Sequence, residues 1–232
     1  MDVRPPDATP GPVVVVGAGP GIGASVARTF GRRGHRVGLV SRSAERLSLL
    51  AGEVAGDIGA EVATASADAT DPDQVRGAIA ELVATIGAPE VLCFSPIPDI
   101  GLIRPVLETR PEDYIASLRL NVGGAAAAVE AVLPAMRARG RGTVLFTTGS
   151  AALRPDPARA TSAVTTTAAS VYIALLRQAV EGTGIRIGHT VVVGPVSRDD
   201  PAAHHPDAVA ADLWAQHTGE ARDFPSVLTL DP

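Results

Sequence analysis

The sequence predicts an α/β fold, with one doubly wound parallel β-sheet that carries helices on both of its faces. Short runs of Val, Leu and Ile alternate with longer segments rich in Ala, Arg and Glu along most of the 232 residues. Unbroken apolar runs are typical of strands that are buried on both faces of a parallel sheet. Their alternation with helical segments indicates βαβ units, in which each helix returns the chain to the start of the next strand.

The expected strands are recognised by their aliphatic and β-branched residues. The first, 12–17, reads PVVVVG and is an unbroken apolar run that ends in glycine. In a sheet of this kind, ligands bind outside the carboxyl ends of the strands. The strands that follow in the chain are expected at 36–41, 60–68, 90–96, 143–149, 185–194 and 226–230.

Helices are expected between these strands, where apolar residues recur at helical spacing. Ser43 is a good N-cap residue for the second helix, and Pro72 fits the first turn of the third. No linker is long enough to divide the pattern, so we expect one domain over residues 12–232 after a short lead, 1–11. The helices are expected at 21–34, 43–56, 71–87, 112–139, 160–182 and 206–218.

Composition argues against several classes of protein. The net charge is −5 and no run of basic residues occurs, whereas proteins that bind nucleic acids need a basic face, so we expect no nucleic-acid partner. No uncharged, strongly apolar run reaches about 18 residues, so we expect no transmembrane segment and no membrane partner. The lead is polar and rich in proline, and it lacks the apolar core of a signal peptide.

Cysteine and histidine usage also limits the chemistry. Cys93 is the one cysteine, which rules out an internal disulfide and a metal–thiolate cluster and indicates a reduced, cytoplasmic setting. His204 and His205 are adjacent, but no histidine pair has the helical spacing of metal ligands, so we expect no metal. His189 lies inside an apolar run and is expected to be a core histidine.

A glycine-rich turn joins the first strand to the first helix. Gly17, Gly21 and Gly23 follow the strand as G-x-x-x-G-x-G, and Ile22 stands where a G-x-G-x-x-G pattern has its third glycine. Glycine permits a sharp turn and lets a diphosphate approach the helix N-terminus, whose N–H groups and dipole favour an anion. The pattern indicates a dinucleotide site; the alternative is a tight turn with a purely structural role.

The ends of the second and third strands carry residues that would select the nucleotide. An acid at the end of the second strand would bind the ribose 2′-hydroxyl of NAD, but this strand ends in Ser41, and Arg42 follows. The guanidinium of Arg42 can pair with a 2′-phosphate, which favours NADP(H) over NAD(H); the alternative is a solvated loop charge. Asp68 would accept a hydrogen bond from the adenine amino group or, alternatively, cap the next helix.

Several stretches together resemble the short-chain dehydrogenase/reductase family over about residues 12–230: GAGPGIG, ADATDPDQV, LRLNVGGA, RGTVLFTTGSAA and TGIRIGHTVVVGPV. The resemblance implies a single-domain Rossmann-type sheet of about seven strands, a nicotinamide cofactor and a small-molecule substrate. It also implies a homodimer or homotetramer formed through helices 112–139 and 160–182. The positions that match the family's cofactor site are Gly17, Gly19, Gly21, Ile22, Gly23, Ser41, Arg42, Asp68, Ala69 and Gly194.

The resemblance breaks down at the family's catalytic Asn, Ser, Tyr and Lys. Asn121 matches, but the serine position falls on Gly149, the tyrosine position on Ser162 and the lysine position on Thr166. In the family the tyrosine transfers a proton and the lysine lowers its pKa, so a serine without a base partner is a poor replacement acid. Thr148, at the end of the fifth strand, is a further residue expected to line the cleft.

No shift of the alignment restores the missing groups. The chain contains no lysine, and its tyrosines are Tyr114 and Tyr172. Tyr172 lies nearly three turns beyond Ser162 on the expected helix and is predicted to pack at a helix interface. The stretch ARATSAVTTTAASVY at 158–172 is rich in Thr and Ser, which are poorer helix formers than Ala. We interpret them as small neutral groups that face the cleft; the alternative is drift after loss of function.

The family's residues are also replaced elsewhere in the part of the site that would hold the nicotinamide. CFSP at 93–96 replaces the family's Asn-Asn-Ala-Gly, and VG at 193–194 replaces its Pro-Gly. The adenosine half of the expected site therefore looks intact, while the half that would hold the nicotinamide does not. Two loops offer other polar groups for chemistry. One loop carries Arg154, Asp156 and Arg159. The other, which matches the family's substrate lid, carries Arg198, Asp199, Asp200, His204 and His205.

Three interpretations remain open from the sequence. The first is an enzyme that binds NADP(H) and acts on a small, fairly apolar metabolite by a non-redox route such as cyclisation, elimination or isomerisation. The second is a reductase that uses a replacement acid or a bound water. The third is an inactive homologue that binds a dinucleotide or pairs with an active subunit.

Overall fold

The structure, a computed structural model, describes residues 9–221 and 223–230, so most of the expected lead lies outside the described residues. Its strands form one seven-stranded sheet, in which every neighbouring pair is parallel. In sheet order they are β3 (Val62–Ser66), β2 (Val37–Ser41), β1 (Val13–Val16), β4 (Val91–Phe94), β5 (Gly142–Gly149), β6 (Ile185–Val193) and β7 (Ser226–Thr229). The predicted doubly wound α/β fold is confirmed, with the strand order reversing between β1 and β4.

Most strands are a little shorter than the sequence predicted, and the differences are largest at β3 and β4. The run expected at 60–68 pairs with β2 only from Val62 to Ser66, because β2 itself ends opposite Ser66. The run expected at 90–96 ends at Phe94, after which the Ser95 amide donates to the Val16 carbonyl at 2.9 Å and the chain leaves the sheet. The carboxyl ends of β1, β2, β3 and β4 therefore lie together at one edge.

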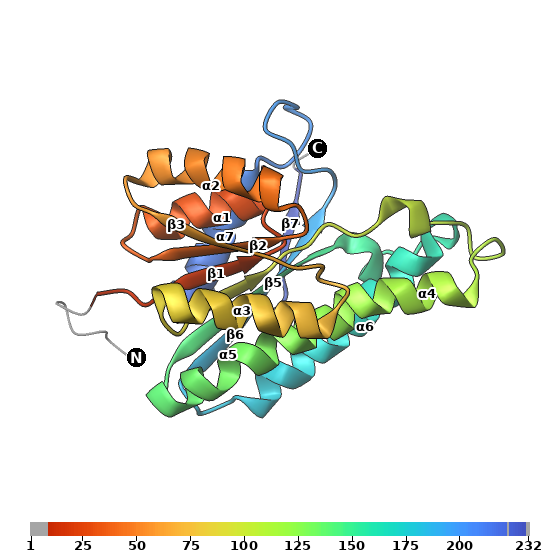
Figure 1. The fold of residues 1–232 in the computed structure, drawn as a ribbon. Coiled ribbons are helices and arrows are strands. Elements are labelled where there is room, and N and C mark those ends of the chain that lie inside the picture. The colour runs from red at the N-terminus through yellow and green to blue at the C-terminus, as the bar shows by residue number, and fades with distance from the viewer. Residues whose placement is uncertain (1–8, 222, 231–232) are drawn as a thin grey trace.

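Helices connect the strands, as shown in Figure 1. They are α1 (Ile22–Gly31), α2 (Ala44–Ile58), α3 (Pro72–Ile86), α4 (Pro111–Leu118), α5 (Ala125–Arg139), α6 (Ala160–Ala179) and α7 (Pro206–Thr218), with 3₁₀ turns at Ile100–Leu102, Ser150–Ala152 and Pro157–Arg159. The Ser43 side chain caps α2 as expected, and α7 has its predicted bounds. The helix expected at 160–182 ends earlier, because Gly182 and Gly184 take positive φ angles and turn the chain into β6.

The helix expected over 112–139 is continuous but changes its winding. A π-helical turn, Arg119–Gly124, separates α4 from α5. Within this turn Gly124 lies against the connection after β3, where an added Cβ would be 2.0 Å from the Ala69 carbonyl oxygen. By length and composition this helix could cross a membrane, a test that core helices also pass. The helix packs in the core through the buried side chains of Val129, Val132 and Met136, so we describe it as a core helix.

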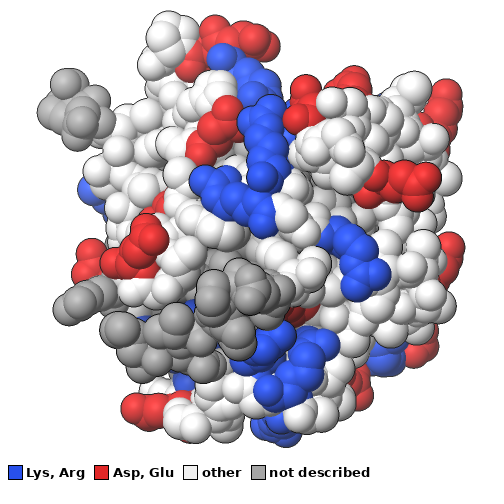
Figure 2. Space-filling view, turned by 90° about the vertical axis from the view of Figure 1, so that its left-hand side faces the viewer, with Lys and Arg blue, Asp and Glu red and all other residues white. Residues whose placement is uncertain are grey.

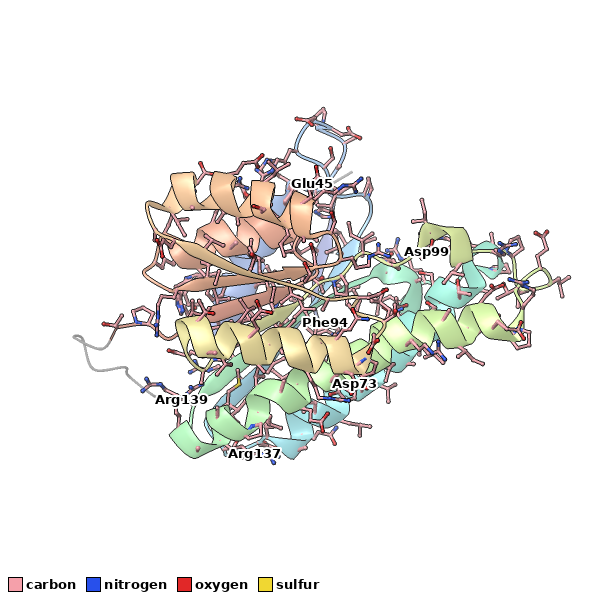
Figure 3. The ribbon with its side chains drawn as sticks, in the orientation of Figure 1. Glu45, Asp73, Phe94, Asp99, Arg137 and Arg139 are labelled. Atoms are coloured by element: carbon pink, nitrogen blue, oxygen red, sulfur yellow. The ribbon has the colours of Figure 1, made fainter. Side chains whose placement is uncertain are left out.

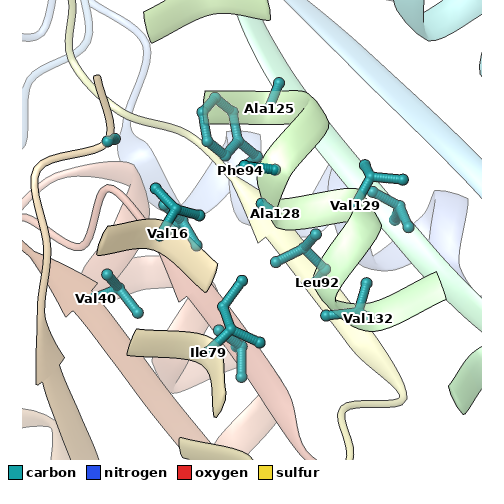
Figure 4. Close-up of a cluster of buried hydrophobic side chains, with 14 of the residues drawn as sticks. Val16, Val40, Ile79, Leu92, Phe94, Ala125, Ala128, Val129 and Val132 are labelled. Carbon is teal, nitrogen blue, oxygen red and sulfur yellow. The ribbon is translucent and has the colours of Figure 1, made fainter. Parts of the chain in front are cut away.

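Two apolar layers hold the sheet between the helices. Alternate residues of β1 point to opposite faces, so Val14 and Val16 contact the layer under α3, α5 and α6, and Val13 and Val15 contact the layer under α1, α2 and α7. Figure 4 shows part of the first layer, in which residues of β1, β2 and β4 meet Ile79 of α3 and Val129 of α5. These layers fix the position of the carboxyl edge of the sheet.

The opposite edge, where the strands begin, is a mixed-charge surface. Figure 2 views the molecule from that side and shows arginine side chains beside aspartates and glutamates. Arg137 and Arg139, at the end of α5, lie on this side, whereas Asp99 lies beyond the carboxyl ends of the strands (Figure 3).

Candidate functional site

A cavity of about 690 Å³ lies at the carboxyl edge of the sheet, where the strand order reverses. Its walls come from the glycine turn, the ends of β2 and β3, the segment 96–102 after β4, and the π-helical turn. Ligands of doubly wound folds bind at this place. Of the residues expected to bind a cofactor, the cavity brings together Gly17, Gly19, Ser41, Arg42, Asp68 and Ala69.

The glycines of the first turn have different roles in the structure. Gly17 has φ +89°, and a Cβ there would lie 2.4 Å from the Cα of Pro96, so this position needs glycine for the fold itself. Gly23 packs α1 against the turn, since a Cβ would lie 2.9 Å from the Cα of Ala18. At Gly19 and Gly21 an added Cβ would meet nothing within 4 Å.

The open space beside Gly19 and Gly21 is where the residues fit a dinucleotide. Gly21 is the N-cap of α1 and Ile22 its first residue, so the free N–H groups of the helix start at this point. A bare backbone on the cavity side permits close approach of a diphosphate, and the dipole of α1 favours its charge. Neither Gly21 nor Ile22 lines the cavity itself; they stand at its rim beside Gly19.

Two arginines line the cavity beyond β2. Ser41 ends β2, and both Arg42 and Arg46 are exposed on the cavity wall. No hydrogen bond or ion pair holds either guanidinium among the described residues. Glu53, about two turns further along α2 than Arg46, also lines this wall. The sequence reasoning missed Arg46, although its place in the first turn of the helix that follows Arg42 was an available signal.

Asp68 orders the end of β3 rather than the next helix. Its Oδ1 accepts hydrogen bonds from the backbone N–H and the hydroxyl of Thr70, both at 2.9 Å. The N-cap of α3 is Asp71, whose carboxylate accepts from the N–H groups of Asp73 and Gln74. The interpretation of Asp68 as a helix cap is therefore wrong, while a contact between Asp68 and adenine stays a prediction.

Asn121 lies on the π-helical turn and bonds to α6. Its Nδ2 donates to Thr165 Oγ1 at 2.9 Å and to Ser117 Oγ at 3.4 Å, and the two hydroxyls are 3.0 Å apart. Thr165 and Ser117 are buried, and Ser117 also reaches the cavity wall. The sequence singled out Asn121 but missed both partners; the spacing of four residues between Ser117 and Asn121 was the available signal.

The hydroxyls at the family's tyrosine and lysine positions lie outside the cavity. Thr166 donates from Oγ1 to the Ser162 carbonyl at 2.7 Å, one turn back along α6. Such a bond satisfies the hydroxyl within its own helix. Neither Ser162 nor Thr166 lines the cavity, so a catalytic role for them stays a prediction.

Thr148, near the end of β5, and His189, in the middle of β6, form a polar pair. Thr148 Oγ1 is 2.8 Å from His189 Nε2, and His189 is 1% exposed. Burial lowers the pKa of His189 to about 4, so the imidazole is neutral at pH 7. The expectation of a core histidine is confirmed. Thr148 faces this histidine and not the cavity, and its catalytic role is untested.

The segment 102–106, which we call the strap, is hydrogen-bonded to the start of α6. Thr161 donates from Oγ1 to the Leu102 carbonyl at 2.7 Å, the Ala160 amide donates to the Arg104 carbonyl at 3.0 Å, and the Val106 amide donates to the Pro157 carbonyl at 2.8 Å. The segment 102–106 after β4 therefore lies on the first turn of α6. Leu102 of this segment also lines the cavity.

The polar residues proposed for the two loops mostly stabilise loop structure. Asp156 accepts from the Ala158 amide, Asp200 accepts from the Ala202 amide, and His204 contacts the Val193 carbonyl at 3.0 Å. Gly194, a predicted cofactor residue, has φ +118° and packs near Leu230, away from the cavity. In the described part of the chain no group of three His, Cys, Asp or Glu residues is placed to hold a metal ion.

Tyr172 and Cys93 belong to the apolar layers. Tyr172 packs on the layer beneath α6, as the sequence predicted, and burial raises the pKa of its hydroxyl. Cys93 is fully buried in β4, and burial raises the pKa of its thiol to about 12. Neither group reaches the cavity.

Comparison with known proteins agrees with this architecture. A family model described as short chain dehydrogenase matches residues 12–201. A curated bovine protein, dehydrogenase/reductase SDR family member 7B from Bos taurus, is 29% identical over 180 residues, which cover 75% of this chain and 55% of that protein. The first three curated relatives are longer, and the matched stretch covers between 16% and 55% of their lengths.

Solved structures share the fold at low sequence identity. Levodione reductase superposes with a TM-score of 0.84 at 19% identity and covers 96% of each chain. A short chain oxidoreductase from Pseudomonas aeruginosa PAO1, described as bound to NADPH and as containing an atypical catalytic center, superposes with a TM-score of 0.81 at 18% identity, covering 90% of this chain and 89% of that one.

Proposed function

Since the chain belongs to the short-chain dehydrogenase family, we propose that it binds NADP(H) and acts on a small, fairly apolar metabolite without the family's tyrosine and lysine. The observation that carries this proposal is the cavity, which joins an open glycine turn to Arg42 and Arg46, whose guanidinium groups have no partner among the described residues. When bound, the cofactor would supply a hydride or act as a structural partner.

The preference for NADP(H) rests on the charge at the end of β2. Arg42 and Arg46 have no carboxylate partner among the described residues, and no acid stands at Ser41 to bind a ribose 2′-hydroxyl. A planar guanidinium pairs well with phosphate oxygens. The described NADPH complex of the Pseudomonas protein is consistent with this cofactor for the fold.

The preference for an apolar substrate rests on the other end of the cavity. Ile97, Leu102, Ala116 and Leu120 line it, with Arg119 among its polar groups. Binding pockets of this kind combine apolar walls with a few polar groups that orient the ligand. Elimination, isomerisation or cyclisation is the chemistry such a pocket can direct by shape.

A second candidate function is an inactive homologue that retains the dinucleotide site. The bond from Thr166 to the Ser162 carbonyl favours it, because the Thr166 hydroxyl is satisfied inside α6. We further propose that the chain is cytoplasmic and that it forms a homodimer or homotetramer. The apolar side chains Ile115, Val164, Val171 and Leu175 are 49–59% exposed on α4 and α6 and suit such an interface.

Titration with NADPH, followed by fluorescence, tests the binding part of the proposal. We expect saturable binding of NADPH to the unaltered chain and weaker binding to Arg42→Ala. Incubation with 4-deuterated NADPH and a panel of small ketones then measures hydride transfer. Substrate conversion without cofactor consumption supports a non-redox enzyme, deuterium in the product supports a reductase, and binding without any conversion supports the inactive homologue. A chain that binds no adenine dinucleotide contradicts all three.

A further inference from the structure

Ser117 belongs to a group of three polar side chains in the wall of the cavity, where α4 and α6 lie side by side (Figure 1). Its Oγ is 3.0 Å from Thr165 Oγ1, and Nδ2 of Asn121 donates to Thr165 Oγ1 at 2.9 Å and to Ser117 Oγ at 3.4 Å. Thr165 is fully buried, whereas Ser117 is 8% exposed and lines the cavity. Of the three, Ser117 is therefore the residue that can meet a ligand.

The hydroxyl hydrogen of Thr165 is directed at Ser117. Three nearby hydroxyls of α6 donate to the carbonyl four residues back along the helix, at 2.7–2.9 Å; they belong to Thr166, Thr167 and Ser170. Thr165 makes no such bond, and in the described part of the chain Ser117 Oγ is the one acceptor that its hydroxyl reaches. A fully buried hydroxyl whose hydrogen had no acceptor would be costly, so Thr165 donates to Ser117.

This arrangement leaves Ser117 able to donate a hydrogen bond but not to accept another. Its oxygen receives the hydrogen of Thr165 and, over a longer distance, one from the Asn121 amide, so donors face both of its lone pairs. Its own hydrogen has no acceptor among the described residues, and the cavity is the open space that it can reach. A ligand that displaces solvent from this wall must supply an acceptor, because it otherwise leaves a buried donor without a partner.

The groups around Ser117 favour a neutral acceptor on an apolar molecule. Arg119 also lines this end of the cavity, but it is exposed, so solvent already hydrates its charge. Asp99 accepts a hydrogen bond from the Gly101 amide at 2.9 Å. The remaining walls of this end are apolar and come from Leu102, Ala116 and Leu120. A carbonyl oxygen on a small, fairly apolar molecule meets these conditions.

We propose that Ser117 binds the substrate by donating a hydrogen bond to a carbonyl oxygen, and that Thr165 and Asn121 set the direction of its hydroxyl. This inference rests on the proposed function and deepens it, since it names the group by which the metabolite is recognised. Hydrogen bonds that follow one another polarise each other, so the bond from Thr165 strengthens the donor at Ser117. A donor at this place stabilises the negative charge that develops on a carbonyl oxygen during reduction or enolisation.

Two pairs of probe ligands isolate the contribution of the carbonyl oxygen. Acetophenone and α-methylstyrene have the same shape but differ in C=O against C=CH₂, and so do cyclohexanone and methylenecyclohexane. Ligand-observed NMR titrations of the full chain measure the affinity for each probe. We expect Ser117→Ala to reduce the affinity for each ketone, relative to its alkene, by roughly 3- to 10-fold, because one neutral hydrogen bond is lost. The affinity for the alkenes should not decrease.

Ser48→Ala is the matched control, since Ser48 is an exposed serine of α2 that does not line the cavity. The ratio of ketone to alkene affinity should stay as in the unaltered chain. If Ser117→Ala does not fold, Ser117→Cys provides a second variant, because a thiol fills the same place but is a weak donor. Its ratio should fall in the same direction.

The direction of the hydroxyls has a readout of its own in the unaltered chain. We expect NMR to detect the hydroxyl proton of Thr165 in slow exchange with water, and the hydroxyl proton of Ser117 in faster exchange. A slowly exchanging Ser117 proton beside a rapidly exchanging Thr165 proton would show that Ser117 donates to Thr165, and would overturn the proposal.

Titrations of the probes without cofactor and with saturating NADP⁺ separate this inference from the proposed cofactor site. A ketone preference that depends on Ser117 in both conditions supports it. The role of Ser117 is overturned if no ketone binds, if Ser117→Ala keeps the preference of the unaltered chain, or if NADP⁺ displaces the ketones, which would assign the acceptor to the cofactor. A chain that does not bind NADP⁺ but shows the dependence on Ser117 would contradict the proposed cofactor and support the role of Ser117.

Discussion

Asn121 and Thr165 join two long helices beside the candidate site: Nδ2 of Asn121 donates to Oγ1 of Thr165 at 2.9 Å, from a π-helical turn to the second turn of α6. Thr165 is fully buried and its hydroxyl also meets Ser117 at 3.0 Å. Polar groups buried in this way are costly to leave without partners.

Replacing Thr165 with valine should therefore destabilise the fold. Thr165→Val keeps the shape but leaves the Asn121 amide and the Ser117 hydroxyl without their partner, at a cost of about 1–3 kcal/mol in the free energy of unfolding. Thr165→Ser keeps the hydroxyl and should cost about 1 kcal/mol or less. Urea denaturation followed by circular dichroism measures both variants. Equal stability of the two would show that the hydrogen bonds contribute nothing.

Substitutions of the glycines in the first turn should separate effects on folding from effects on cofactor binding. Gly17→Ala forces a side chain into a left-handed backbone conformation and against the Cα of Pro96, 2.4 Å away, so we expect poor folding or a loss of about 2 kcal/mol or more. Gly19→Ala places a methyl group in open space and should fold normally. It should weaken NADPH binding, because the methyl occupies the approach to the helix. Thermal denaturation and fluorescence titration of both variants check this, and a normal NADPH affinity of Gly19→Ala would place the dinucleotide elsewhere.

Arg42 should govern the choice between the two nicotinamide cofactors. Arg42→Ala removes a charge-assisted contact to the 2′-phosphate, so we expect about 10- to 100-fold weaker binding of NADPH. Binding of NADH, which lacks this phosphate, serves as the internal control and should change little. Arg46→Ala should show the same selectivity with a similar or smaller loss. A variant that loses both cofactors equally would assign these arginines to the fold instead.

Stability should decrease on mild acidification because of His189. Its pKa is lowered to about 4 in the folded chain, while an exposed histidine titrates near 6.5. Between these values the unfolded chain binds more protons than the folded one, so the free energy of unfolding falls as pH decreases from 6.5 to 4. The loss amounts to about 3 kcal/mol at most.

Denaturation curves measured between pH 7.5 and 4.5 test this effect. His189→Gln removes the titrating group, so its stability should vary less with pH than that of the unaltered chain, whatever its absolute value. An equal slope in the two proteins would contradict the assignment. The partner variant Thr148→Val should keep the slope, because the histidine remains buried and neutral.

The thiol of Cys93 should be unreactive in the folded protein. Complete burial raises its pKa to about 12, and the thiolate is the reactive form. Ellman's reagent should therefore detect almost no reactive thiol in buffer and one reactive thiol per chain in denaturant. The rate of reaction in intermediate urea then reports global unfolding. Rapid labelling of the native protein would show that β4 opens locally.

Much of this architecture could be predicted from the sequence because its signals are local. The valine run 13–16, the N-cap Ser43 and the proline at the start of α3 each specify an element without reference to the rest of the chain. The glycine turn and Arg42 mark the cofactor side in the same way. Each of these signals involves only a few neighbouring residues, so spacing alone identifies it.

The remaining features depend on contacts between distant segments. The π-helical turn follows from the close approach of Gly124 to the Ala69 carbonyl, which no periodicity reveals. The positions of Ser162 and Thr166 could be aligned, but only the folded chain shows that neither lines the cavity. Likewise, the partner of Arg198 is Ser25, far away in the sequence, and only the folded chain brings them together.

The hydrogen bonds between the strap and the start of α6 couple two connections that protein engineers usually vary one at a time. Lengthening the connection after β4 alone would leave the amide of Ala160 and the hydroxyl of Thr161 facing no acceptor, and shortening the one after β5 would do the same to the amide of Val106. Attempts to recruit new substrates by loop grafting should therefore transplant both segments from a single donor.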